Sequence, residues 1–122
     1  MQTISATNYS IFFNEKSYEF LAEVLVPNHY SKIFILVDEN TATHCLPTFL
    51  ANLATEVTIE IIELEAGESH KNIETCLQLW HSLTELGGDR KSILINLGGG
   101  VISDIGGFVA CTFKRGIDFI NV

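Results

Sequence analysis

Residues 93–108 read ILINLGGGVISDIGGF, and this stretch decides the fold. An apolar run ends in three consecutive glycines, Gly98–Gly100, and Asp104 follows four residues after the last of them. An apolar strand that turns through glycines into a helix is typical of a parallel α/β sheet. Glycines at such a turn permit positive φ and let a pyrophosphate approach the backbone N–H groups of the helix N-terminus. They could equally serve only a tight turn and close packing.

As a match to the dinucleotide fingerprint G-x-G-x-x-G, the stretch is imperfect, because Ser103 stands where the third glycine is expected. In that fingerprint the glycines follow the first strand, and an acidic residue comes about twenty residues later. Here the glycines come late in the chain, and Asp118 begins a strand rather than ending one. The motif alone therefore leaves the tight turn and the phosphate cradle open.

The sequence on either side alternates strands with helices. Short apolar runs predict buried strands, and periodic apolar positions predict helices. The predicted strands are 32–37, 57–64, 92–97 and 117–122, after a strand pair within 3–14, and the predicted helices are 17–25, 39–54 with a break at Pro47, 69–88 and 101–113. We therefore predict an α/β, Rossmann-like fold, with a mainly parallel sheet, flanking helices and an N-terminal strand pair.

Two local expectations accompany this fold. In the helix 69–88, one apolar stripe is expected to face the core, and Gly87 and Gly88 are expected to cap the end of the helix. The stripe consists of Ile73, Cys76, Leu77, Trp80 and Leu83. The strand 117–122 has no helix after it, which would leave an edge or face uncovered. We therefore expect either that the chain is the front of a longer protein or that another segment covers this strand.

The composition excludes several classes of protein. The 122 residues suffice for one domain, and a 47% hydrophobic content supports a core. A net charge of −8 argues against nucleic-acid binding and against attachment to an anionic membrane. Cys45, Cys76 and Cys111 show neither zinc spacing nor a disulfide framework, so reduced thiols in a cytoplasmic protein are expected. The four histidines show no metal-binding pairing either.

Polar sequence follows three of the predicted strands, where open parallel sheets bind ligands. Asp38, after the first, could accept hydrogen bonds from ribose hydroxyls or simply cap the next helix. Glu68 and Lys71, after the second, are spaced like a solvated ion pair. Asp104 could orient the glycine loop or a cofactor, or only complement the helix dipole.

Taken together, these blocks resemble one family. LGGGVISDIGGFVACTFKRGI (97–117) closely resembles the 3-dehydroquinate synthase pattern L-G-G-G-V-x-x-D-x-x-G-F-x-A-x-x-x-x-R-G-I. GESHK (67–71) resembles the family's G-E-x-x-K segment, and DEN (38–40) its D-x-N segment. Three blocks in the right order make the match specific. Iron-dependent alcohol and glycerol dehydrogenases share the fold and a similar turn, but generally lack the R-G-I continuation.

The resemblance implies an NAD-dependent lyase of the shikimate pathway. Members convert 3-deoxy-D-arabino-heptulosonate 7-phosphate, a sugar phosphate, into 3-dehydroquinate and phosphate. NAD⁺ transiently oxidises a ring hydroxyl and is regenerated in each turnover. A divalent metal, zinc or cobalt, is held by a C-terminal helical domain, and a homodimer is implied.

The resemblance also implies roles for individual residues. Asp38 and Asn40 would lie at the adenosine-side ribose, and Glu68 and Lys71 along the dinucleotide. Gly98, Gly99, Gly100 and Val101 would contact the pyrophosphate, and Asp104 the nicotinamide side. Gly106 and Gly107 are expected instead to let the short helix pack closely on its neighbours. Arg115 would reach the substrate phosphate across a dimer interface, or else form a surface or interface ion pair.

Other segments typical of the family are missing from the 122 residues: the P-T-T loop, the catalytic lysines, and the Glu and two His that bind metal. We therefore expect a truncated NAD-binding portion, with neither a catalytic residue nor a metal site of its own. Another sugar-phosphate cyclase and an inactive NAD-binding or assembly fragment remain the alternatives.

Overall fold

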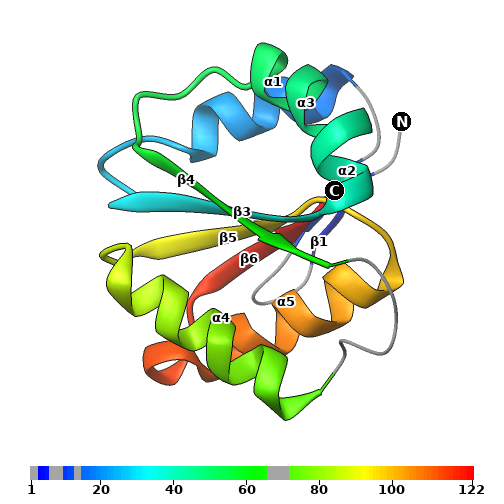
Figure 1. The fold of residues 1–122 in the computed structure, drawn as a ribbon. Coiled ribbons are helices and arrows are strands. Elements are labelled where there is room, and N and C mark those ends of the chain that lie inside the picture. The colour runs from blue at the N-terminus through cyan, green and yellow to red at the C-terminus, as the bar shows by residue number, and fades with distance from the viewer. Residues whose placement is uncertain (1–2, 6–9, 13–14, 66–71) are drawn as a thin grey trace.

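A six-stranded sheet forms the middle layer of the molecule (Figure 1). The computed structural model describes residues 3–5, 10–12, 15–65 and 72–122. The strand order is β1-β2-β6-β5-β3-β4; β1 and β2 pair antiparallel, and all other neighbours pair parallel. The strands are β1 (Thr3–Ser5), β2 (Ser10–Phe12), β3 (Lys32–Asp38), β4 (Ile59–Leu64), β5 (Ser92–Asn96) and β6 (Asp118–Asn121). This confirms the predicted fold class and the N-terminal strand pair.

Helices cover both faces of this sheet (Figure 1). One face carries α1 (Glu15–Val24), α2 (Glu39–His44) and α3 (Leu46–Asn52). The other carries α4 (Ile73–Glu85) and α5 (Gly100–Thr112), and a 3₁₀ turn, η2 (Phe113–Arg115), leads from α5 to β6. The break predicted at Pro47 is confirmed, because Pro47 lies at the start of α3, where its missing N–H leaves no helical hydrogen bond unmade.

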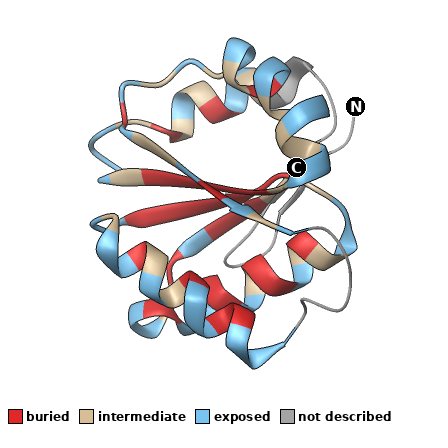
Figure 2. Ribbon diagram, in the orientation of Figure 1, coloured by how far each residue is buried: buried red, intermediate tan, exposed pale blue. Residues whose placement is uncertain are grey.

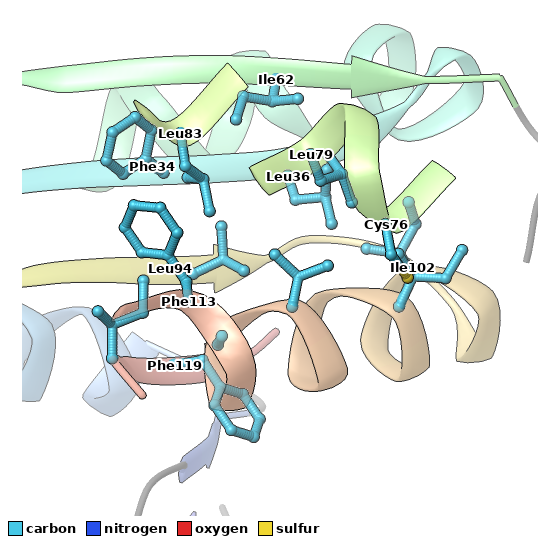
Figure 3. Packing of buried hydrophobic residues seen from close by; sticks show 14 residues of the cluster. Phe34, Leu36, Ile62, Cys76, Leu79, Leu83, Leu94, Ile102, Phe113 and Phe119 are labelled. Carbon is cyan, nitrogen blue, oxygen red and sulfur yellow. The ribbon is translucent and has the colours of Figure 1, made fainter. Parts of the chain in front are cut away.

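Strand β3 shows why the sheet is buried on both faces. Phe34 and Leu36 point into a core shared with α4 and α5, whereas Ile33, Ile35 and Val37 point into a second core with α1 and α3. Successive side chains of a strand point to opposite faces, so an unbroken apolar run requires cover on both. Figure 2 shows the buried residues gathered on the strands and on the helix sides that face them. Figure 3 shows the first core, where Phe34, Leu83 and Phe113 lie between the sheet and its helices.

The stripe predicted for α4 is only partly correct. Cys76 and Leu83 are buried, but Ile73 and Leu77 are 61% and 55% exposed. Leu79, which the predicted stripe omitted, is buried instead and lies in the same core as Ile62 and Leu36 (Figure 3). The predicted cap is confirmed: Gly87 has φ +84, and the Gly88 N–H donates to the Leu83 carbonyl.

The expectation that another segment covers 117–122 is confirmed, because β6 lies inside the sheet. It pairs with β5 on one side and, through Ile11 and Asn121, with β2 on the other. Phe119 packs into the core beneath α5, and Ile120 into the opposite core. The N-terminal strand pair therefore provides the cover that the local sequence around β6 does not reveal.

Candidate functional site

The ends of three strands meet at one edge of the sheet. Strands β5, β3 and β4 are adjacent and parallel, so their carboxyl ends lie together. Asp38 pairs with Leu64 in the β3–β4 register, and the Leu97 N–H extends the β5–β3 ladder to the Leu36 carbonyl at 2.9 Å. The predicted convergence is confirmed as far as residue 65. Glu68 and Lys71 lie outside the described residues.

The chain departs from this edge of the sheet through the glycine turn, and its backbone is extended at Gly99. Gly99 is the N-cap of α5 with φ −80° and ψ −163°, and the described glycines with positive φ are Gly87 and Gly116. The expectation of positive φ at Gly98–Gly100 is therefore wrong. A Cβ at Gly99 or Gly100 would meet no atom of the described residues within 4 Å, whereas one at Gly98 would press on Ile102. Packing thus requires a small residue at Gly98, whereas the space beside Gly99 and Gly100 is open.

The first turn of α5 offers unpaired backbone donors at this open space. The Ser103 N–H closes the first helical bond to the Gly99 carbonyl at 3.1 Å. The N–H groups before it, from Gly100 to Ile102, precede the helical ladder and have no acceptor within the helix. The Val101 side chain is half-buried against the α5 core, so only its backbone remains for a ligand. Open backbone and a helix N-terminus together suit an anion such as a pyrophosphate.

Asp104 lies farther along α5, beyond its first turn, which contains no acidic residue. Complementation of the first turn is therefore not its role. Its side chain is exposed and lines a hollow of about 310 Å³ beside Phe108 and Ile73. Contact with the nicotinamide side stays a prediction.

Asp38 caps α2. Its Oδ1 accepts a hydrogen bond from the Thr41 N–H at 2.8 Å, and the Thr41 hydroxyl accepts one from the Asp38 N–H at 2.9 Å. This reciprocal arrangement confirms the capping interpretation. A carboxylate has lone pairs for further donors, so the cap leaves the ribose contact possible in principle. Asn40 follows on the exposed side of α2.

Next to this site, at the end of β4, the surface is acidic. A hollow of about 400 Å³ there is lined by Glu63, Glu65 and Glu74, among others. Carboxylates repel a pyrophosphate, so this hollow does not fit the anionic part of a dinucleotide. The glycine turn fits it better.

Arg115 does not lie at the carboxyl edge of the sheet. It lies in η2 before β6, at the amino ends of the strands, and is separated from the glycine turn by roughly the 16 Å length of β5. A shallow hollow of about 570 Å³ is lined there by Asp89, Arg90, Lys91, Lys114 and Arg115. Four of the chain's seven Lys and Arg residues thus gather at the amino edge. The contact across a dimer interface stays a prediction.

Sequence reasoning missed a buried polar pair beneath the site. Asn96 at the end of β5 is fully buried, and its Nδ2 donates to the Oδ1 of Asn121 in β6 at 3.0 Å. A Cβ on Gly106 of α5 would overlap the Asn96 amide, so only glycine fits there. The close packing predicted for Gly106 is confirmed. The signal was present in the sequence: Asn96 is the only polar residue in the apolar run ILINL.

Other candidate chemistry is limited. Within residues 3–5, 10–12, 15–65 and 72–122, no three His, Cys, Asp or Glu side chains gather as a metal site would require. The cysteines are free thiols, and burial raises the pKa of Cys76. No helix in this part of the chain is long and apolar enough to span a bilayer.

Comparison with known proteins gives a consistent picture. The family model "3-dehydroquinate synthase N-terminal" matches residues 61–122, about half of the chain. The 3-dehydroquinate synthase of Parabacteroides distasonis is 41% identical over 84% of this chain, and that of Campylobacter jejuni is 42% identical over 75%. The chain covers 29% and 26% of those two relatives, so it spans well under a third of their length.

Solved structures share the fold. A crystal structure of 2-deoxy-scyllo-inosose synthase matches 99% of this chain and 35% of its own, with a TM-score of 0.76 and 22% identity. A 2-epi-5-epi-valiolone synthase structure with NAD⁺ and Zn²⁺ bound has a TM-score of 0.71 and 19% identity. Identities this low carry the fold, not the reaction.

Proposed function

The chain belongs to the 3-dehydroquinate synthase family, whose N-terminal model it matches, and on that premise we propose that its carboxyl edge binds NAD. The observation that carries the proposal is the glycine turn. Gly99 and Gly100 leave the α5 N-terminus open, so a pyrophosphate can approach its N–H groups without meeting a side chain of the part of the chain that the structure describes. These residues sit at a strand end where open α/β sheets bind nucleotides.

In this proposal each residue has a physical task. The backbone N–H groups of Gly100 and Val101 donate to pyrophosphate oxygens, and the α5 dipole stabilises their charge. Asp38 accepts from a ribose hydroxyl while it caps α2, and Asn40 lies beside it. When bound, NAD supplies the oxidation and later reduction of a substrate hydroxyl. The chain's own contribution is to hold and orient the cofactor.

For the whole protein we propose the family reaction: 3-deoxy-D-arabino-heptulosonate 7-phosphate is converted into 3-dehydroquinate and phosphate. The relatives with about 40% identity carry that name, which favours this reaction over those of other sugar-phosphate cyclases. A homodimer in the cytoplasm, with Arg115 reaching the partner's substrate phosphate, belongs to the same proposal. So does a divalent metal, zinc or cobalt, for which the described residues hold no fitting ligand cluster.

Titration of the 122-residue chain with NAD⁺ tests the binding role. We expect saturable one-site binding in calorimetry, competed by ADP-ribose, which carries the same pyrophosphate. A folded chain with no detectable affinity would contradict the proposal and favour an assembly fragment. Size-exclusion chromatography of the same sample shows whether the chain then forms a stable oligomer.

The reaction itself is tested on the full-length gene product. We expect phosphate release from the heptulosonate phosphate when NAD⁺ and Zn²⁺ or Co²⁺ are supplied. Well-folded protein that releases no phosphate from this substrate, yet turns over another sugar phosphate, would place the protein with a different cyclase.

A further inference from the structure

Asn96 is a buried amide whose oxygen has no conventional partner. The residue is 0% exposed, and its Nδ2 donates to Asn121 Oδ1 at 3.0 Å. None of the N–H or O–H donors in the described part of the chain reaches the Asn96 Oδ1. A buried carbonyl without a donor destabilises the folded chain, so its surroundings need an explanation.

Gly106 supplies that explanation. A Cβ on Gly106 would overlap Asn96 Oδ1, and in glycine this direction is taken by the second Hα. The Cα–H group therefore points at the oxygen, in the arrangement of a weak C–H···O hydrogen bond. This contact also fixes the orientation of the amide: the flipped Asn96 would turn an N–H group against the C–H group and leave two acceptor oxygens facing one another at Asn121.

The fixed orientation carries over to Asn121. Its Oδ1 is engaged by Asn96, so its two amide hydrogens are what the side chain still offers, and they have no acceptor among the described residues. Asn121 is half-buried at the carboxyl end of β6, in register with Asn96, and Asn96 lies two residues before Gly98. The unused donors therefore sit on the strand next to the glycine turn.

We propose that Asn121 is a ligand-contacting residue of the nucleotide site and donates its amide N–H groups to an oxygen acceptor on the dinucleotide. Asn96 and Gly106 are positioning residues, because they hold the Asn121 amide with its donors available. This inference rests on the proposed NAD-binding function and adds a residue from a fourth strand end to it. The acceptor is an oxygen of either the pyrophosphate–ribose part or the nicotinamide carboxamide.

The Asn121→Asp variant tests the contact on the 122-residue chain. The aspartate keeps an oxygen for the Asn96 donor but has no N–H group, so we expect NAD⁺ affinity to fall at least 10-fold, while the unfolding midpoint stays near that of the parent. Asn52→Asp makes the same chemical change on α3, where the Asn52 Nδ2 donates to the Thr48 carbonyl, and is the matched control. Equal NAD⁺ affinity in the two variants would overturn the proposal.

Further measurements separate the remaining explanations. Asn121→Ala removes the donors without adding charge, so we expect it to weaken NAD⁺ binding as well; unchanged binding would reduce the Asp effect to charge repulsion and overturn the contact. Titration of the Asn121 variants with ADP-ribose locates the acceptor. If the affinity for ADP-ribose falls as much as that for NAD⁺, the acceptor lies in the pyrophosphate–ribose part. If only the affinity for NAD⁺ falls, the acceptor is the carboxamide.

The double variant Asn96→Ala/Gly106→Ala tests the positioning role. Because the alanine side chain at 106 occupies space vacated by the Asn96 amide, we expect the unfolding midpoint of the double variant to lie near that of the parent. NAD⁺ affinity should nevertheless stay several-fold lower, because nothing then orients Asn121. Parent-like affinity would overturn the positioning role. A parent chain that binds no NAD⁺ would remove the proposed function itself, an outcome distinct from parent binding with an inert Asn121.

Discussion

The two edges of the sheet are built in opposite ways. At the amino edge, the turn before β5 satisfies its own polar groups: Asp89 Oδ1 accepts from the Ser31 hydroxyl at 2.6 Å and from the Lys91 N–H at 2.8 Å. At the carboxyl edge, Gly99 and Gly100 leave the backbone bare. The first edge is closed by side chains that bond one another, whereas the second keeps donors for something else.

The difference teaches where an acidic chain can hold an anion. Four basic side chains lie at the amino edge, yet they belong to a shallow surface where water screens charge. The carboxyl edge has no such cluster among its described residues and relies on backbone N–H groups and a helix dipole, which cost no side-chain entropy to order. Charge alone would have selected the amino edge rather than the edge that we propose binds the dinucleotide.

The largest expected effect is at Gly106, which supports the open edge from below. Gly106→Val forces a branched side chain onto the Asn96 amide, so we expect a loss of about 3 kcal/mol in the free energy of unfolding, measured by urea titration. Gly107→Ala is the control, since its Cβ would meet Phe119 at an ordinary 3.5 Å. That variant should gain up to about 1 kcal/mol from helix propensity. Equal stability of the two variants would show that α5 does not depend on this contact.

The next effect is on binding and not on stability. Gly99→Val places a side chain where the structure has open space, and Gly99 has negative φ, which valine tolerates. We therefore expect a change of less than about 1 kcal/mol in unfolding free energy. NAD⁺ affinity should fall at least about 10-fold, or 1.4 kcal/mol, in calorimetry. If affinity is unchanged, the open edge is not a phosphate cradle, and the comparison between the edges loses its functional meaning.

Asp38 separates capping from ribose binding at the same edge. Asp38→Ala removes the cap from α2 and should cost about 1 kcal/mol of stability, whereas Asp38→Asn retains a capping oxygen and should cost less. If Asp38 also accepts from a ribose hydroxyl, both variants weaken NAD⁺ binding, and the Asn variant does so with stability nearly intact. Parent-like NAD⁺ affinity in Asp38→Asn would leave Asp38 as a helix cap alone.

The local sequence pattern was enough to predict the helices and strands, but not which elements pair or pack with one another. The run 32–37 predicted a strand covered on both faces, and its alternating contacts with the two cores confirm it. The position of β6 could not be read, because β2, which covers it, comes from the other end of the chain. In α4, apolar residues occupy more than one face, so periodicity alone could not choose Leu79 over Ile73 and Leu77; packing in the core that also holds Ile62 and Leu36 did.

For the site, the sequence located the three strand ends but not the backbone conformation of the turn. Positive φ was expected because glycines permit it, yet Gly99 adopts an extended N-cap geometry open to most residues. In the proposed site, the requirement for glycine there comes from the approach of a ligand, which no intramolecular pattern encodes. At Gly106 the requirement comes from Asn96, ten residues away, and becomes visible only once α5 lies on β5.

The smallest expected effect is at the closed amino edge. The Ser31 hydroxyl bond holds the pKa of Asp89 below its usual value, with smaller lowering contributions from the Lys91 N–H, Ser92 and Lys114. A carboxylate with a lowered pKa stabilises the fold above its unfolded-state pKa, and this contribution is lost as pH falls through the folded-state pKa. Ser31→Ala should therefore raise the pKa of Asp89, followed by NMR titration of its carboxyl carbon.

Because Asp89 is exposed, water screens the interaction, and the Ser31→Ala cost at neutral pH should stay below about 1 kcal/mol. The cost should vanish in acid, where Asp89 is protonated in both the folded and the unfolded chain. Ser103→Ala, on the carboxyl edge, should leave the Asp89 titration unchanged. A Ser31→Ala chain with weakened NAD⁺ affinity would contradict the separation of the two edges, because it would couple a turn that satisfies itself to the edge proposed to bind the ligand.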